Sequence, residues 1–240
     1  MLYFFINDTR RPSDSIEYIM KSYLIISLAI IYYQAFVAAS NKVKKVPLTV
    51  DIYYNLESER GKDFFKQQFL RHYNQIKDHT KIKFIPYIKP LGENDTAKRD
   101  SKFPCPPGYP DCSEGEFHAC AINSINLFIQ EANQPLLTGI LINCAMASEF
   151  TINVLYKCAD VVVLSDDLVN GIGFCMTSGL GKKLITDFNN QMEAVNSTIV
   201  LNPLVVLNGV YSRENHLKAR FRFFNLICDN LPLQNRPSKC

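Results

Sequence analysis

The sequence predicts an α/β fold in which a small sheet is interrupted by a helical insertion. Three observations carry this prediction. Residues 46–88 follow the order strand, helix, strand, which is the beginning of a right-handed parallel β-α-β unit. A proline-, glycine- and charge-rich excursion then leads into several helical stretches. The chain finally returns to a strand after Asn202-Pro203 and closes with an amphipathic helix.

Changes in periodicity define the opening unit. Residues 46–54 are rich in β-branched and aromatic side chains, as expected of a buried strand. From Ser58 to Ile76, apolar side chains recur at intervals of three and four, which predicts a helix. Ser58 is well placed to cap the N-terminus of that helix, because serine is a preferred N-cap residue. Residues 81–88 alternate and predict the second strand.

The helical insertion is predicted over residues 103–192. Apolar periodicity indicates helices near residues 116–132, 136–144, 149–158 and 180–192. Four glycines in the last part of the insertion are interpreted as breaks or as points of close packing: Gly171, Gly173, Gly179 and Gly181.

The C-terminal part is expected to complete the sheet. Residues 202–207 predict a third strand, and Asn208-Gly209 is a strong hairpin signal, so a further strand is expected after the turn. A last amphipathic helix covers residues 215–229. Residues 46–230 are therefore predicted to form a single domain, followed by a tail over residues 231–240.

Composition excludes several classes of protein. Of the 240 residues, 47% are hydrophobic and 20% are charged, which allows a sizeable core and excludes bulk disorder. The 26 lysine and arginine residues nearly balance the 23 aspartate and glutamate residues, and the net charge is +3. Nucleic-acid binding is not expected, because proteins that bind nucleic acids concentrate basic residues on one face.

The N-terminal segment has the pattern of a secretory signal peptide. Lys21 precedes an apolar run over residues 23–36, and the small residues Ala38, Ala39 and Ser40 follow it. The run has 14 residues, fewer than the roughly 20 that a membrane span needs. We expect residues 1–39 to be an N-terminal extension and a cleaved signal peptide that starts at Met20, leaving no stable membrane span. The alternative is a signal anchor that stays attached.

A secretory route makes the cysteines candidates for disulfides. All eight lie in the distal part of the chain, and neither C-x-x-C nor H-x-x-x-H spacing occurs, so no metal site or cofactor is expected. The pairing stays open, since eight cysteines allow 105 pairings. Asn94 and Asn196 lie in glycosylation sequons that suit the same compartment. The cysteines predicted to form structural disulfides are Cys105, Cys112, Cys120, Cys144, Cys158, Cys175, Cys228 and Cys240.

The order of elements is the layout of a thioredoxin-like fold with an inserted, disulfide-stapled helical subdomain. The active surface of such a fold lies where the first strand meets its helix, beside the loop that precedes the third strand. In this chain those places are Leu56 to Gly61 and Asn202-Pro203. We predict that Pro203 follows a cis peptide bond, which would set it against the N-terminus of the helix.

A cysteine pattern in the insertion resembles the signature of the gamma-interferon-inducible lysosomal thiol reductase (GILT) family, C-Q-H-G-x-x-E-C-x-x-N-x-x-x-x-C. The cysteines and the glycine stand at matching spacing in Cys105, Gly108, Cys112 and Cys120. Asp111 takes the place of the glutamate, a proline pair replaces Gln-His, and the asparagine is a glycine. The resemblance continues over nearly all of residues 46–228.

The resemblance implies a thioredoxin-like fold and reduction of protein disulfides at acidic pH, in endosomes or lysosomes or after secretion. In the family this chemistry resides in a C-x-x-C at the end of the first strand, where one thiolate attacks and the second cysteine resolves the mixed disulfide. Matched residue by residue, the two positions fall on Ser58 and Gly61. This chain therefore lacks the catalytic pair.

Two hypotheses follow. The chain is a redox-inactive family member that binds a protein or peptide partner, or it is an oxidoreductase that reduces disulfides through other cysteines, such as Cys105 and Cys112. For Ser58 a helix cap is favoured over a hydrolytic nucleophile, because no G-x-S-x-G surrounds it.

Overall fold

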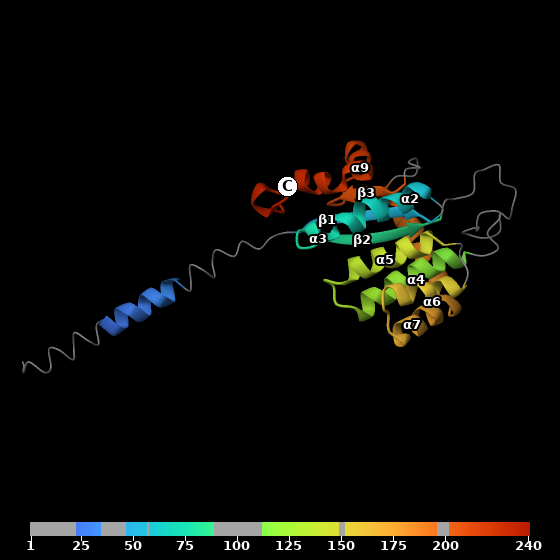
Figure 1. The fold of residues 1–240 in the computed structure, drawn as a ribbon, viewed down its shortest axis with the longest axis horizontal. Coiled ribbons are helices and arrows are strands. Elements are labelled where there is room, and N and C mark those ends of the chain that lie inside the picture. The colour runs from blue at the N-terminus through green and yellow to red at the C-terminus, as the bar shows by residue number, and fades with distance from the viewer. Residues whose placement is uncertain (1–22, 35–46, 57, 89–111, 149–151, 196–201) are drawn as a thin grey trace, which may run out of the picture. The chain divides into compact units, whose positions relative to one another are not determined.

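The computed structural model describes residues 23–34, 47–56, 58–88, 112–148, 152–195 and 202–240 (Figure 1). The chain divides into two units, Met1–Lys45 and Val46–Cys240. In the first unit, residues 23–34 form a helix with exposed apolar side chains. Among the helices that the structure describes, none combines the length and apolar character that crossing a membrane requires. The small residues expected at the cleavage site, Ala38 to Ser40, lie outside the described residues, and cleavage of the signal peptide stays a prediction.

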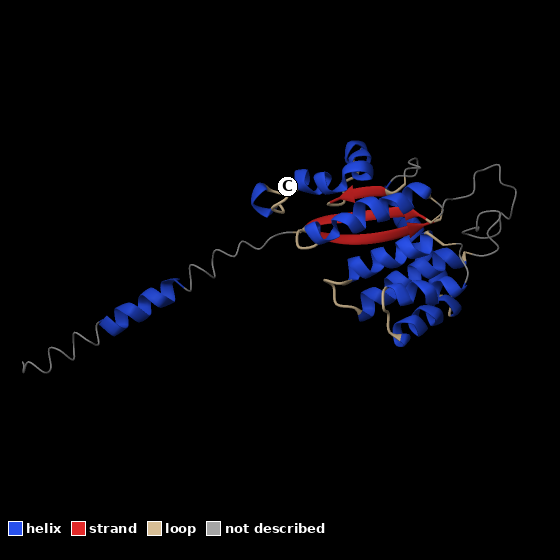
Figure 2. Cartoon of the chain, in the orientation of Figure 1, coloured by secondary structure: helices blue, strands red, loops and turns tan. Residues whose placement is uncertain are grey.

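The second unit contains a three-stranded sheet with the order β2-β1-β3 (Figure 2). Strand β1 (Leu48–Asn55) pairs in parallel with β2 (Thr80–Tyr87), and the predicted β-α-β opening is confirmed. Strand β3 (Leu204–Leu207) pairs antiparallel with β1. Together with the helices described below, this arrangement confirms the predicted α/β thioredoxin-like fold.

A continuous helical segment connects β1 to β2, as predicted. It consists of α2 (Glu59–Phe64), a π-helical turn η1 (Phe65–Phe69) and α3 (Leu70–Ile76). The predicted helix near the C-terminus is α9 (Arg213–Asn230), which is kinked at Arg222. The kink removes the backbone N–H of Phe223 from the helical pattern, and this N–H donates to Gln68 Oε1 of η1 at 3.1 Å. A side chain from the π-helical turn thus satisfies a donor at the kink of α9.

The helical insertion contains five helices in the described residues. Four of these helices have bounds close to the predicted ones: α4 (Ser113–Phe128), α5 (Gln134–Met146), α6 (Ile152–Val161) and α8 (Leu180–Val195). The predicted first helix was too long at its C-terminal end, because Ile129 adopts an extended conformation and ends α4.

Helix α7 (Asp166–Thr177) was not predicted, since its glycines were interpreted as breaks or as points of close packing. Ser165 caps the helix by accepting the N–H of Leu168. One face of α7 is buried, and Cys175 on that face is bonded to Cys120 of α4. Tertiary burial and the disulfide therefore override the low helix propensity of Gly171 and Gly173.

The strand expected after Asn208-Gly209 is not formed. Both residues have positive φ (49° and 74°), as a tight hairpin turn requires. Beyond the turn, pairing is limited to one bridge between Leu207 and Val210, and Ser212 then caps α9. The Asn208 side chain accepts the backbone N–H of Thr49 at 3.0 Å, so the turn is attached to β1 instead of extending a hairpin.

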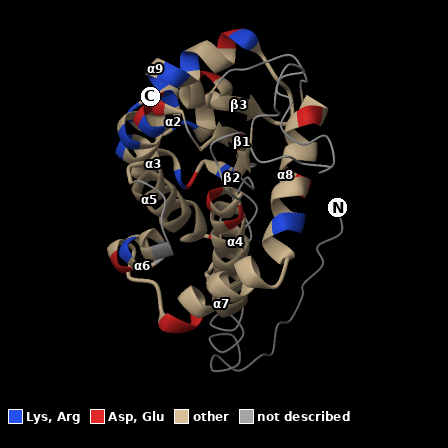
Figure 3. Cartoon of the chain, turned by 90° about the vertical axis from the view of Figure 1, so that its right-hand side faces the viewer, with Lys and Arg blue, Asp and Glu red and all other residues tan. Residues whose placement is uncertain are grey.

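The sheet separates two layers of helices. Figure 3 shows α2, α3 and α9 on one side of the sheet and α8 on the other. The first side holds the largest core, in which Ile52 and Tyr54 of β1 meet the aromatic side chains of α2, η1 and α9. The second side packs Tyr53 and Ile85 against α8, and the insertion has a core of its own.

Three disulfides lie entirely within the described residues. Two of them join helices of the insertion, Cys120 with Cys175 and Cys144 with Cys158. The third joins Cys228 of α9 to Cys240. Cys112 is also disulfide-bonded, none of the described cysteines is a free thiol, and Cys105 lies outside the described residues. Disulfides that close such loops typically stabilise a domain by about 2–4 kcal/mol each.

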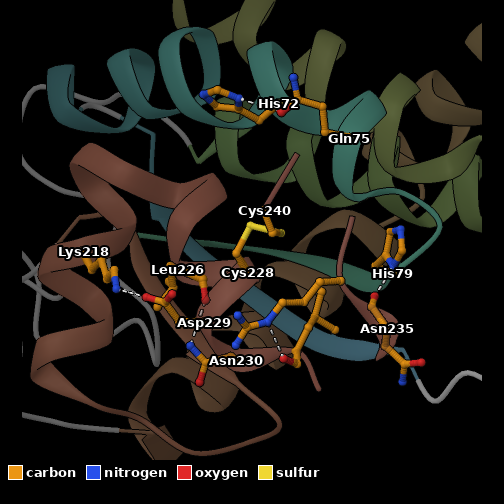
Figure 4. Close-up of a disulfide and its surroundings, with 12 residues drawn as sticks. His72, Gln75, His79, Lys218, Leu226, Cys228, Asp229, Asn230, Asn235 and Cys240 are labelled. Carbon is orange, nitrogen blue, oxygen red and sulfur yellow. Dashed lines mark hydrogen bonds and ion pairs between the residues drawn. A yellow bond between two sulfur atoms is a disulfide. The ribbon is translucent and has the colours of Figure 1, made fainter. Parts of the chain in front are cut away.

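The residues predicted to be a tail are attached to the domain (Figure 4). A short 3-10 helix η2 (Leu233–Asn235) follows α9, and the carbonyl of Asn235 hydrogen-bonds to the His79 ring at the start of β2. The guanidinium of Arg236 donates to the carbonyl of Leu231 at 3.0 Å. With the Cys228–Cys240 disulfide, these contacts hold residues 231–240 against the end of α9 and the α3–β2 connection.

Two glycine-to-alanine variants test the packing of the insertion. A Cβ on Gly139 would lie 2.2 Å from Cε1 of Phe69, so Gly139→Ala should destabilise the protein by about 1–3 kcal/mol. Gly173 has nothing within 4 Å of its Cβ position, so Gly173→Ala should stabilise α7 by about 0.5–1 kcal/mol. Urea unfolding of both variants measures the difference. Equal effects would contradict the close approach of α5 to η1.

Candidate functional site

The candidate site lies where β1 ends, α2 begins and the chain enters β3. The Asn202–Pro203 peptide bond is cis, and Pro203 is buried. Because Tyr53 pairs with Leu204 in the sheet, the proline stands beside the carboxyl end of β1. The two places singled out by the sequence, Leu56 to Gly61 and Asn202-Pro203, are therefore brought together.

Ser58 is the N-cap of α2. It has extended backbone angles (φ −82°, ψ 115°), and its Oγ accepts the backbone N–H of Gly61 at 3.3 Å. This is the arrangement in which a serine satisfies one of the N–H groups exposed at a helix start. No histidine of the described chain hydrogen-bonds to Ser58, so nothing there would activate the hydroxyl as a nucleophile.

Gly61 lies at the centre of the site and is buried. A Cβ at this position would be 3.0 Å from Cε of Met146, and 3.5 Å from both Oδ1 of Asn202 and the carbonyl oxygen of Asn55. The end of α5, the cis-proline loop and the end of β1 thus meet at one residue. A side chain at Gly61 fits here when the flexible tip of Met146 gives way.

The Asn202 side chain holds the cis-proline loop against β1. Its Oδ1 accepts the backbone N–H of Asn55 at 3.2 Å, and its Nδ2 donates to the carbonyl of Asn55 at 3.2 Å. One amide therefore makes both backbone contacts that a neighbouring strand would make. This contact joins positions 147 residues apart in the sequence.

His216 of α9 supports the cis-proline from behind. Its side chain is 2% exposed and makes a hydrogen bond to the backbone of Pro203. Burial lowers the pKa of His216, the hydrogen bond to Pro203 opposes this effect, and the charge of Arg220 adds to it. Its Nδ1 has no hydrogen-bond partner in the described part of the chain.

A second buried histidine lies beneath the end of β1. Tyr54 Oη and His118 Nδ1 are 3.0 Å apart and share a hydrogen bond, and both side chains are fully buried. Burial lowers the pKa of His118 to about 3. Burial also raises the pKa of the Tyr54 hydroxyl, and the charge of Glu114 adds to this rise. Both side chains are therefore neutral at neutral pH.

Charged side chains surround the start of α2. Glu59 lies in the first turn, where a carboxylate interacts favourably with a helix N-terminus, and Lys62 Nζ pairs with it at 2.7 Å. Helix α3, which carries Arg71, and helix α9, which carries several lysine and arginine residues, lie on the same side of the sheet (Figure 3). Within the described residues, no group of three or more His, Cys, Asp or Glu side chains could hold a metal ion.

Sequence reasoning missed four residues of this site: Met146, Asn202 as a side-chain contact, His118 and His216. The histidines are scattered along the chain, and no local spacing links them to Tyr54 or Pro203. The sequence places His118 on the same predicted helix as Cys120. Its burial, however, depends on the docking of the insertion against β1.

The sheet order, the helix that begins after β1 and the cis-proline before β3 define a thioredoxin-like fold. Two solved structures share the fold. MdbA, a thiol-disulfide oxidoreductase from Actinomyces oris, superposes with a TM-score of 0.54 at 12% identity, covering 79% of this chain and 83% of that one. MdbA from Corynebacterium matruchotii superposes with a TM-score of 0.50 at 15% identity, covering 73% and 82%. At these identities the likeness shows the fold.

Sequence comparison shows which proteins the chain resembles. The family model for gamma interferon inducible lysosomal thiol reductase (GILT) matches residues 49–162. The GILT-like protein of Anopheles gambiae is 25% identical over 201 residues, which is 82% of this chain and 80% of that protein. GILT-like protein 1 of Drosophila melanogaster is 24% identical over 201 residues, 80% of this chain and 77% of that protein. The chain is therefore similar to proteins of the GILT family.

Removing the Asn202 amide tests its role in holding the loop. Asn202→Ala loses two hydrogen bonds, each worth about 0.5–1.5 kcal/mol, so the free energy of unfolding should fall by about 1–3 kcal/mol. The matched control is Asn230→Ala, which removes one part-buried bond from the Asn230 amide to the carbonyl of Leu226 and should cost less. Equal losses in chemical denaturation would show that the loop does not depend on Asn202.

The buried His118 makes stability depend on pH. Its pKa is about 3 in the folded protein and about 6.5 when unfolded, so the unfolded state binds the extra proton as pH falls. The stability that neutral His118 provides is complete above about pH 6.5 and is lost progressively as pH falls toward 3. Between pH 7.5 and pH 5 this loss amounts to about 2 kcal/mol.

His118→Gln keeps a side chain that can hydrogen-bond to Tyr54 and removes the titrating ring. Urea unfolding at pH 7.5 and pH 5 should therefore show a smaller stability loss in the variant, by about 2 kcal/mol, whatever its stability at neutral pH. Parallel pH profiles of the variant and the natural protein would refute the buried, neutral state of His118.

Proposed function

We propose that this protein is a redox-inactive GILT-family member of the secretory pathway that acts by binding a protein or peptide partner. The observation that carries the proposal is the chemistry of the helix start beside the cis-proline. Ser58 there is a helix cap, and Gly61 is a buried glycine under Met146. The sequence contains no cysteine before Cys105, so no thiol stands at this site.

Disulfide reduction needs a thiolate that attacks a sulfur atom and a second thiol that releases the enzyme from the mixed disulfide. The hydroxyl of Ser58 does not form an anion at physiological pH and does not exchange with sulfur. Gly61 has no side chain and therefore cannot release the protein from a mixed disulfide. The fold therefore keeps the geometry that the family uses, while the two groups that would perform exchange are absent.

The disulfide content supports the same proposal. Every described cysteine is paired, and those of the insertion join buried helix faces. Reduction through another cysteine would need a thiol able to reach a substrate. The pairs Cys120–Cys175 and Cys144–Cys158 join helices of the insertion, which favours a structural role for them over the alternative of an oxidoreductase acting through other cysteines.

The compartment we propose is the secretory pathway, with secretion or delivery to endosomes or lysosomes. Support comes from the predicted signal peptide, the disulfides and the family, whose name in the Carassius auratus relative is "gamma-interferon-inducible lysosomal thiol reductase". Glycosylation at Asn94 and Asn196 fits this route, and both asparagines lie outside the described residues.

A disulfide-reduction assay at acidic pH tests the proposal. The natural mature protein should show no turnover, because the helix start lacks thiols. The double variant Ser58→Cys/Gly61→Cys should gain measurable turnover. If Met146 crowds the new side chain at position 61, a triple variant that also carries Met146→Ala has room for it and should keep this turnover. The single variant Ser58→Cys is the matched control, because it can attack a disulfide but has no partner to resolve the product.

Turnover by the natural protein that Cys105→Ser or Cys112→Ser abolishes would overturn the proposal in favour of an oxidoreductase that uses other cysteines. The binding role is measured separately, by fluorescence anisotropy with a carboxymethylated, permanently unfolded protein that cannot exchange disulfides. Binding without turnover supports the proposal. The absence of both would contradict a role in recognising unfolded chains.

A further inference from the structure

Helix α9 presents two large apolar side chains to solvent. Leu217 and Phe221 are 48% and 65% exposed. They are four residues apart, so they lie one turn apart on the same face of the helix. The opposite face is buried through His216, Ala219 and Phe223. Figures 1 and 3 show α9 at the end of the domain opposite to α7 of the insertion. The apolar pair therefore projects from the outer surface of the domain.

Arginine side chains border this apolar pair. Arg213 lies one turn before Leu217 on the same face of α9, and Arg220 follows Leu217 by three residues. The guanidinium of Arg220 is 4.8 Å from the centre of the Phe221 ring. Among the ion pairs of the described residues, none involves Arg213 or Arg220. Both arginines therefore keep an unpaired positive charge beside the exposed apolar side chains.

The first half of α9 concentrates positive charge. Residues 213–222 contain four basic residues and one acidic residue, Glu214, so these ten residues carry a net charge of +3, as much as the whole chain. Lys218 is already paired with Asp229, so it adds less to the local field than the arginines do. The excess of positive charge selects an anionic binding partner. It also disfavours a second copy of this face, because that contact would bring like charges together.

The length of this face favours a lipid surface over a partner helix. The kink at Arg222 limits the straight part of α9 to residues 213–221, which is about 14 Å of helix. A helix-to-helix seam is normally sustained over several heptads, whereas this face offers two apolar side chains. A helix that lies in the headgroup region of a membrane needs an apolar stripe flanked by lysine or arginine, and it needs no matching groove. The first half of α9 has this arrangement.

We propose that the outer face of the first half of α9 binds an anionic lipid surface. Leu217 and Phe221 enter the boundary between headgroups and acyl chains, while Arg213 and Arg220 contact lipid phosphates. Two apolar side chains and a few charges make this binding weak and reversible. His216 on the inner face of α9 bonds to Pro203, so the docked helix stays attached to the cis-proline loop.

Co-sedimentation with lipid vesicles tests the proposal. The mature chain is used, because it lacks the exposed apolar helix of residues 23–34 and keeps the compact unit Val46–Cys240. It should bind vesicles of phosphatidylcholine and phosphatidylserine about tenfold more strongly than vesicles of phosphatidylcholine alone, and added salt should weaken the binding. Arg213→Gln/Arg220→Gln should lower binding about tenfold. The matched control is Lys182→Gln/Lys183→Gln, which removes two exposed charges from α8 and should leave binding unchanged.

A tryptophan probe reports whether the apolar pair enters the lipid. The sequence contains no tryptophan, so a single introduced one is the only source of indole fluorescence. Phe221→Trp should shift its emission to the blue on addition of the anionic vesicles, and brominated lipid should quench it. The matched control is Leu233→Trp at a 78% exposed position of η2, whose emission should not change. Leu217→Ser/Phe221→Ser should lower vesicle binding about tenfold.

The proposal fails if the mature chain does not bind the anionic vesicles, or if the arginine and serine variants bind them as well as the natural protein. An unshifted Phe221→Trp emission would also overturn it. If heparin or polyglutamate binds the serine variant and the natural protein equally, while vesicles bind neither, the face belongs to a soluble polyanion instead. Ser58→Cys/Gly61→Cys should leave vesicle binding unchanged, which separates this result from the test of the proposed function.

Discussion

The contact between Asn202 and the end of β1 is the constraint on which the site depends. The two hydrogen bonds from one amide to the backbone of Asn55 fix the cis-proline loop after the chain has passed through the whole helical insertion. The same contact sets the position of β3, because Pro203 leads directly into it. Gly61 then sits between this loop, Met146 and β1, where a larger side chain would require movement of Met146.

Buried neutral imidazoles support the site from two directions. His216 contacts Pro203 from α9, and His118 bonds to Tyr54 from α4. Each ring has one nitrogen without a hydrogen-bond partner among the described residues, and burying a polar atom in this way costs stability. The insertion and the C-terminal helix are thus both coupled to the sheet through groups that resist protonation.

The elements that were predicted correctly are those whose signals are local. The helix over residues 59–76 follows from its apolar spacing and from Ser58, and the cap bond to Gly61 needs no distant residue. Helix α7 was missed because its stability comes from a buried face and from Cys120, which is 55 residues away in the sequence. The expected strand after Gly209 failed for a similar reason, since the side chain of Asn208 bonds to β1.

The sequence by itself determined the β-α-β opening, the position of the cis-proline loop relative to the strands, and the lack of any thiol before Cys105. These depend on residue identity and short-range periodicity. The tertiary structure decided which cysteines pair, that Met146 lies over Gly61, and that His118 meets Tyr54. Each of these depends on how the insertion packs against the sheet, and packing between distant segments leaves no periodic trace in the chain.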